Sequence, residues 1–144
     1  MRVRDFLRSI HKEVRQLASL RKQKDMLLSD CAGLRGMRYD MTPVSGGKQG
    51  DLSDAIITIE FRRKQIEDMI DRKLERIMAK RQQAYMLLEK LPESPAKSAV
   101  QEHYLYGVSW EEVGEDIHYN AGYARQLAYQ CISQLERIQA EMSF

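Results

Sequence analysis

The sequence predicts an all-α fold, and two observations carry this prediction. Apolar residues recur with helical periodicity almost from end to end of the 144 residues, whereas the alternating patterns typical of strands are scarce. Most glycines and all three prolines fall near residues 33–50, 91–95 and 107, where they divide the helical stretches. We therefore expect a long N-terminal helical hairpin followed by a unit of shorter helices.

The first predicted helix covers residues 4–30, and the second begins after a glycine-rich loop at about 33–50. Asp51 or Ser53 can cap the second helix, which continues to about residue 91 as roughly 38 residues, or about 57 Å. A helix of that length normally packs against a partner. The first helix can form an antiparallel hairpin with it, and a second copy of the chain, giving a homodimer, is the alternative partner. The apolar positions of the two helices are Leu7, Ile10, Val14, Leu17, Leu28, Ile56, Ile59, Ile66, Ile70, Leu74, Ile77, Ala84, Leu88 and Leu91.

The two prolines that follow Leu91 predict a boundary between two domains, 1–91 and 94–144. The balance of positive and negative residues changes near the same place. Residues 1–90 hold 20 Lys and Arg against 13 Asp and Glu, whereas residues 91–144 hold 3 against 8. The hairpin is therefore a candidate basic or oligomerisation region, and the C-terminal unit is acidic.

The C-terminal unit predicts three helices separated by tight turns. The first runs from about 95 to 106 and ends at Gly107, and the second runs from 110 to 117. Ser109 precedes the second helix as its N-cap, with Glu112 completing the Ser-x-x-Glu capping box. Residues 118–120 form the next turn, and Asn120 caps a final helix over about 121–138. Two helices joined by a turn of three or four residues have helix-turn-helix geometry.

The stretch from Tyr106 to Asn120 resembles region 4 of bacterial sigma factors, in which Gly-x-Ser/Thr-x-x-Glu-Ile-Ala leads through a small polar cap into the recognition helix. The Ser109-Trp110 pair and the Tyr before the cap are more similar to phage regulators of the RinA and ArpU type. Weaker similarities extend upstream to residue 39. The resemblance implies a DNA-binding transcription regulator of phage or prophage type, with double-stranded DNA and bacterial RNA polymerase as partners.

If the docking of that family applies, the start of the last helix faces the major groove. Arg and Gln read guanine and adenine through paired hydrogen bonds, and helix N-termini bind phosphates. The predicted DNA-binding residues are Ser109, Asn120, Ala121, Gly122, Tyr123, Arg125 and Gln126. The sequence departs from the family here, because the helix starts with two small residues and Lys97, Arg125 and Arg137 are the cations of an acidic unit.

Other chemistry finds little support in the sequence. Trp110 and most tyrosines are predicted to pack in the core, with Tyr123 exposed. The three histidines are isolated from other metal ligands, so neither a metal site nor a cofactor is predicted. The stretch Glu111-Glu112-Val113-Gly114-Glu115 matches one acidic motif of all-α nucleotide pyrophosphohydrolases of the MazG type, but the second motif is missing, so an enzyme is not predicted.

The sequence also predicts a location and leaves two alternatives open. No apolar run approaches the roughly 20 residues of a membrane span, no secretory h-region is seen, and Cys31 and Cys131 suit a reducing compartment, so we expect the bacterial cytoplasm. One alternative is an oligomeric helix-turn-helix scaffold, such as a small terminase-like subunit for DNA packaging. The other is a protein-interaction module that does not bind DNA.

Overall fold

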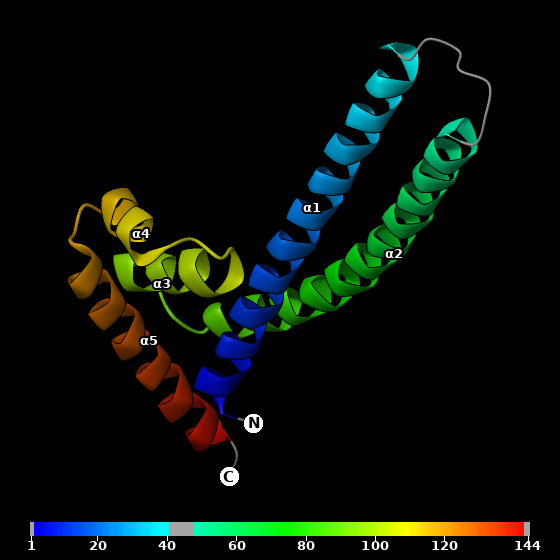
Figure 1. The fold of residues 1–144 in the computed structure, drawn as a ribbon. Helices are drawn as coiled ribbons and strands as arrows, with labels where there is room; N and C mark the ends of the chain where they lie inside the picture. The colour runs from blue at the N-terminus through cyan, green and yellow to red at the C-terminus, as the bar shows by residue number, and fades with distance from the viewer. Residues whose placement is uncertain (1, 41–47, 143–144) are drawn as a thin grey trace. The chain divides into compact units, whose positions relative to one another are not determined.

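The computed structural model describes residues 2–40 and 48–142, and within them every regular element is helical (Figure 1). The all-α prediction is therefore confirmed. No helix in these two ranges is both long and apolar enough to cross a membrane. In chain order the elements are α1 (Val3–Asp40), α2 (Lys48–Leu88), α3 (Pro95–Val100), the π-helical turn η1 (Gln101–Leu105), α4 (Trp110–Ile117) and α5 (Ala121–Met142).

The connection between the two long helices is shorter than the predicted loop at about 33–50. Helix α1 continues through Gly33 and Gly36, and α2 already includes Asp51 and Ser53, which were expected to cap it. A single glycine weakens a helix by about 1 kcal/mol, so a helix that is already long continues through it. Residues 41–47, which hold the proline and two of the glycines of the predicted loop, lie outside the described residues.

The described chain forms two compact units. Unit 2 comprises residues 17–74, where the later part of α1 packs against the earlier part of α2. Lys24 and Glu67 form an ion pair between the two helices at 3.3 Å. The buried apolar residues of this unit are Leu17, Leu20, Cys31, Ile56 and Ile66.

Unit 1 comprises residues 1–16 and 75–144, so it joins the first turns of α1 and the end of α2 to all the shorter helices. This division differs from the predicted boundary at 91–94. The physical reason is a shared core, in which the first turns of α1 and the last turns of α2 bury apolar side chains with α3, α4 and α5. The core residues are Val3, Leu7, Ile10, Ala84, Leu88, Ala99, Val100, Tyr104, Leu105, Val113, Ala124, Ala128, Cys131, Ile132 and Leu135.

Polar groups reinforce the contact of α1 and α2 with the shorter helices. The Nε of Arg81 on α2 donates to the carbonyl oxygen of Leu105 at 2.8 Å, which satisfies an acceptor at the end of η1. The Nδ1 of His11 on α1 donates to the carbonyl oxygen of His103 at 2.9 Å. Lys80 on α2 pairs with Glu13 on α1 at 3.1 Å. These bonds fix the N-terminal part of α1 within unit 1.

The predicted helix over 95–106 is present but changes its winding. Ser94 is its N-cap, accepting from the backbone N–H of Lys97, and Pro95 occupies the first turn as expected. At residues 101–105 the chain widens into η1, and the N–H of Tyr106 donates to Gln101 five residues back. Gly107 then takes a φ of 76°, the left-handed conformation that ends such a helix, as predicted.

Helix α4 ends in a tight turn that joins it to α5. The N–H of Tyr119 donates to the carbonyl oxygen of Gly114 at 2.8 Å, and that of His118 donates to Glu115. His118 adopts a φ of 66°, which is left-handed and is the usual place for glycine after a helix. The predicted turn over 118–120 is therefore confirmed, with a β-carbon at its most strained position.

Replacing His118 by glycine is expected to stabilise the protein. Glycine removes the steric penalty of the left-handed conformation, and the gain is about 0.5 to 1 kcal/mol, reduced by the greater freedom of the unfolded chain. Urea unfolding followed by circular dichroism measures the change. His118→Ala is the control because it keeps the β-carbon and should gain nothing. A lower midpoint for His118→Gly than for wild type contradicts the strain assigned here.

Candidate nucleic-acid interface

The first turns of α5 bring together six of the seven predicted DNA-binding residues. The side-chain oxygen of Asn120 accepts from the N–H of Tyr123 at 2.8 Å, so the predicted N-cap is present. Gly122, Arg125 and Gln126 are exposed on the turns that follow, and Ala121 is half-buried at the helix start. The polar groups predicted to contact DNA are therefore accessible to solvent.

Two tyrosines form an exposed pair at the same end of α5. Tyr123 is 41 % exposed, as predicted, and its ring meets the ring of Tyr119 edge-on at 4.8 Å between centroids. Tyr106, Tyr119 and Tyr129 are also exposed, so the expectation that most other tyrosines pack inside is wrong for these three. Each of these three tyrosines is exposed because it lies at an outward position of a helix or a turn. The number of tyrosines in the sequence does not indicate this.

The outward face of α5 extends well beyond the predicted residues. It continues about three turns past Gln126 as an open polar hollow, lined by Gln126, Tyr129, Gln130, Ser133, Gln134 and Arg137. The inward face carries the buried side chains of Ala124, Ala128 and Ile132. Period-3.6 spacing from the cap could have predicted this longer face, because positions 126, 130, 133 and 137 lie on one side of a helix.

Helix α4 packs on α5 and leaves its carboxylates exposed to solvent. Val113 and Gly114 are buried at this contact. Ser109 caps α4 through its Oγ, which accepts from the N–H of Glu112 at 3.3 Å, so the predicted cap is present. Ser109 lies at the opposite end of this eight-residue helix from Asn120, about 12 Å along the axis, and is not part of the cluster at the start of α5. The exposed acidic residues are Glu111, Glu112, Glu115 and Asp116.

One carboxyl group lies beneath this acidic face. Burial raises the pKa of Glu102 on η1, and the negative charge of Asp116 raises it further. Among the described residues, however, no group of three His, Cys, Asp or Glu side chains is arranged to hold a metal ion. The acidic face of α4 therefore contributes negative potential but no defined cation cage.

Lys97, one of the three cations of residues 91–144, is not available to a ligand. It is only 6 % exposed, and its Nζ donates to the carbonyl oxygen of Leu91 and to a carboxylate oxygen of Glu93. Its role is to close the connection between α2 and α3. The positive charge that this part of the chain offers at the surface therefore comes from Arg125 and Arg137.

A row of stacked rings crosses unit 1 from α1 to α5. The imidazole of His103 stacks on Trp110 at 3.7 Å and on His11 at 4.4 Å, and Tyr104 meets the edges of these rings. Trp110 in turn contacts the ring of Tyr129 edge-on at 6.5 Å. Trp110 is half-buried against the core, so it serves mainly as a packing residue, and the row connects η1 and α4 to the exposed face of α5.

Comparison with protein-family models, with curated proteins and with solved structures gives no match.

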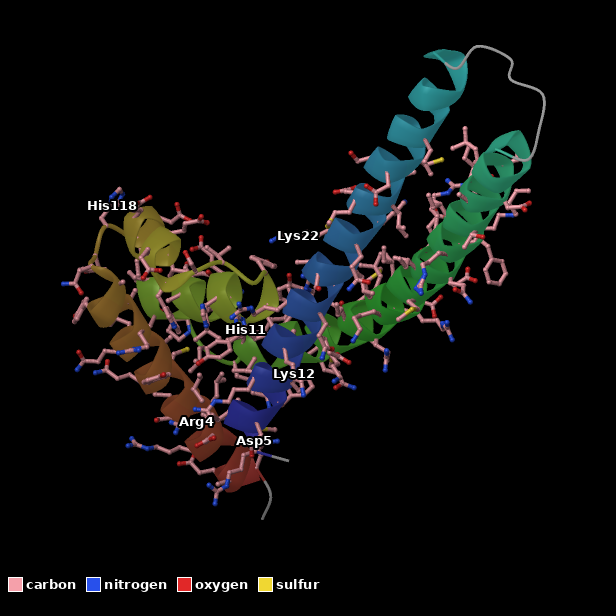
Figure 2. The ribbon with its side chains drawn as sticks, in the orientation of Figure 1. Arg4, Asp5, His11, Lys12, Lys22 and His118 are labelled. Carbon is pink, nitrogen blue, oxygen red and sulfur yellow. The ribbon has the colours of Figure 1, made fainter. Side chains whose placement is uncertain are left out.

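The N-terminus of α1 supplies a cation that sequence reasoning did not place near α5. The guanidinium of Arg4 lies over the ring of Tyr129 at 5.8 Å, and the backbone N–H of Arg4 donates to Glu136 on α5. Figure 2 labels Arg4 at the N-terminal end of α1. The two segments are 132 residues apart in the chain. No local pattern indicates such a contact, because it arises from the packing of both chain ends into one core.

Proposed function

We propose that the chain is a DNA-binding transcription regulator of phage or prophage type that reads duplex DNA with the start of α5. The observation that carries this proposal is the arrangement of α4, a three-residue turn and α5, with exposed side chains at the start of α5. That arrangement supports insertion of α5 into a major groove. Asn120, Tyr123, Arg125 and Gln126 are the residues we expect to contact DNA, with bacterial RNA polymerase as a further expected partner.

The assignment of roles follows from the chemistry of each group. Arg125 can donate two hydrogen bonds to a guanine, and Gln126 can bind an adenine through its amide. Tyr123 can contact a thymine methyl group or a phosphate. Ala121 and Gly122 add no bulk, which lets the N-terminal end of α5 approach the phosphate backbone closely. The likeness to sigma-factor region 4 supports this proposal at the level of the helix-turn-helix.

Truncating Arg125 is expected to relax sequence preference. Arg125→Ala removes a side chain that reads one base pair, so preference at that position should fall by on the order of 1–3 kcal/mol. The measurement selects duplexes from a random pool with the wild-type protein and then titrates the preferred duplex and its single-base variants against both proteins. Arg137→Ala is a matched control, because Arg137 is an exposed arginine on the same helix more than three turns further on.

Two outcomes decide this proposal. Base reading by α5 is supported if Arg125→Ala loses sequence preference at one base-pair position. Arg137→Ala should then lower the affinity for all duplexes evenly or leave it unchanged. Equal behaviour of the two variants contradicts it. If the wild-type protein binds no duplex but still binds RNA polymerase, the chain is a protein-interaction module instead.

The oligomeric scaffold remains the second candidate, and one observation favours it. Unit 2 exposes large apolar side chains on α2, including Ile57 and Phe61, which are each 64 % exposed and lie one helical turn apart. Apolar residues at that spacing can pack against another copy of the chain. The molecular mass in solution distinguishes the candidates, since a monomer or homodimer suits a regulator and a ring of many copies suits a DNA-packaging subunit.

A further inference from the structure

We infer that the N-terminal part of α1 is a second DNA-contacting element, which binds the phosphate backbone beside the base pairs that α5 reads. This inference deepens the proposed function and rests on it. The element is a stripe of four cations on α1, here called the α1 cation stripe: Arg4, Arg8, Lys12 and Arg15. The partner it fits is the phosphate backbone of a DNA duplex.

Helical spacing places the four cations on one side of α1. They are separated by four, four and three residues, so they fall within about 80° of one another around the helix axis. The opposite side carries Val3, Leu7 and Ile10, all buried in the core of unit 1. Arg8, Lys12 and Arg15 are exposed, and Arg4 is half-buried.

The stripe begins next to α5 within the same unit. Its first member, Arg4, covers the ring of Tyr129, which belongs to the outward face of α5. Positive charges of the stripe also act on the aromatic row, since Arg8 and Arg4 oppose the rise in the pKa of Tyr104 that burial causes. The charge of Arg15 likewise helps to lower the pKa of His103 within the row. The N-terminal end of the stripe therefore borders the outward face of α5, and the row of packed rings connects the two helices.

The net charge of this segment suits a polyanion. Residues 2–15 hold five Lys and Arg side chains against Asp5 and Glu13, and Glu13 is already paired with Lys80. The face of α5 offers only Arg125 and Arg137, too few to supply the electrostatic share of binding that most DNA-binding proteins need. The α1 cation stripe supplies the missing positive charge at the border of that face.

The dimensions of the stripe also fit a phosphate backbone. From Arg4 to Arg15 the helix rises by about 16 Å, which corresponds to roughly five phosphates of one DNA strand along the duplex axis. Long and flexible Arg and Lys side chains on an exposed helix can follow such a row without a fixed register. The stripe would therefore add affinity and no base preference.

The test compares two triple variants that remove equal charge. Arg8→Gln, Lys12→Gln and Arg15→Gln neutralise the exposed part of the stripe and leave Arg4 in its contact with Tyr129. Arg21→Gln, Arg62→Gln and Lys64→Gln neutralise three exposed cations of unit 2 as the control. Fluorescence anisotropy measures binding of each protein to a labelled mixed-sequence duplex and to the duplex preferred by wild type, between about 50 and 200 mM KCl. Circular dichroism melts check that both variants fold.

The expected result is a weaker dependence of DNA affinity on salt in the stripe variant alone. The slope of log affinity against log salt should fall by about 0.9 for each phosphate contact removed, so by up to about 2.7, and affinity for all duplexes should fall by at least about tenfold. An unchanged slope, or an equal fall in both triple variants, overturns the inference while base reading by α5 stands. Binding of no duplex by the wild-type protein overturns the proposed function and this inference together. A reduced slope without any effect of Arg125→Ala supports the stripe and contradicts base reading by α5.

Discussion

Replacing Gly114 by alanine is expected to destabilise the protein by about 3 kcal/mol. A β-carbon at this position would lie 2.5 Å from the carbonyl oxygen of Tyr119 and 3.1 Å from the carbonyl carbon of Asn120. Both are backbone atoms of the turn between α4 and α5, so no side chain can move aside to make room. The turn would have to shift away from α4, breaking the hydrogen bond from the N–H of Tyr119 to the carbonyl oxygen of Gly114. The midpoint of urea unfolding measures the loss.

A second glycine in the neighbouring helix is the matched control. A β-carbon at Gly122 would lie 3.5 Å from the side-chain oxygen of Asn120, which is ordinary van der Waals contact. Gly122→Ala should therefore leave stability unchanged or raise it by up to about 1 kcal/mol through helix propensity. If both substitutions shift the midpoint in the same direction and by similar amounts, the close approach of the turn to α4 is contradicted.

Mild acid is expected to destabilise unit 1 through His103. Its pKa is lowered to about 4, first by burial of the ring and then by the positive charges of His11 and Arg15, although the hydrogen bond to Val108 opposes the shift. The unfolded chain, in which a histidine titrates near 6.5, takes up the proton first. The stabilisation is therefore complete above pH 6.5 and is lost as the pH falls towards 4. With allowance for the solvent that reaches the ring, we expect a loss of about 1 to 2 kcal/mol.

Unfolding free energies measured between about pH 7 and 5 test this expectation. This range is chosen because most carboxylates titrate below it. His103→Gln should be less stable at pH 7, because the stack on Trp110 is lost, and its stability should vary less over this range. A wild-type protein whose stability is flat or rises on acidification from pH 7 to 5 would show that His103 does not stay neutral in the folded state.

Local signals predicted the elements of unit 1 because caps and turns depend on neighbours in sequence. Ser94, Ser109 and Asn120 each accept the backbone hydrogen bond that an N-cap requires, and Gly107 has the expected positive φ. Gly114 is the intermediate case. A glycine within a helical pattern is typical of a close backbone approach, but only the structure identifies the turn backbone at residues 119–121 as the neighbour.

Features that depend on long-range packing could not be predicted. The sequence suggests a surface cation at Lys97, yet this side chain is buried, and its carbonyl partner, Leu91, belongs to the connection between α2 and α3. The stack of His11 on His103 joins residues 92 positions apart, and the contact of Arg4 with α5 joins residues further apart still. Helical periodicity gives the buried side of α1 but does not say which helix covers it. The position of Arg4 beside the outward face of α5 is therefore seen only in the folded chain.

Amide chemical-shift mapping can show whether the start of α5 contacts duplex DNA. A two-dimensional NMR spectrum of the labelled protein is recorded before and after addition of a duplex selected from a random pool. We expect the largest shifts at residues 120–126, with smaller shifts along the N-terminal part of α1 and little change on the acidic face of α4. Shifts confined to α4 or to unit 2, or no shift with any duplex, would contradict it.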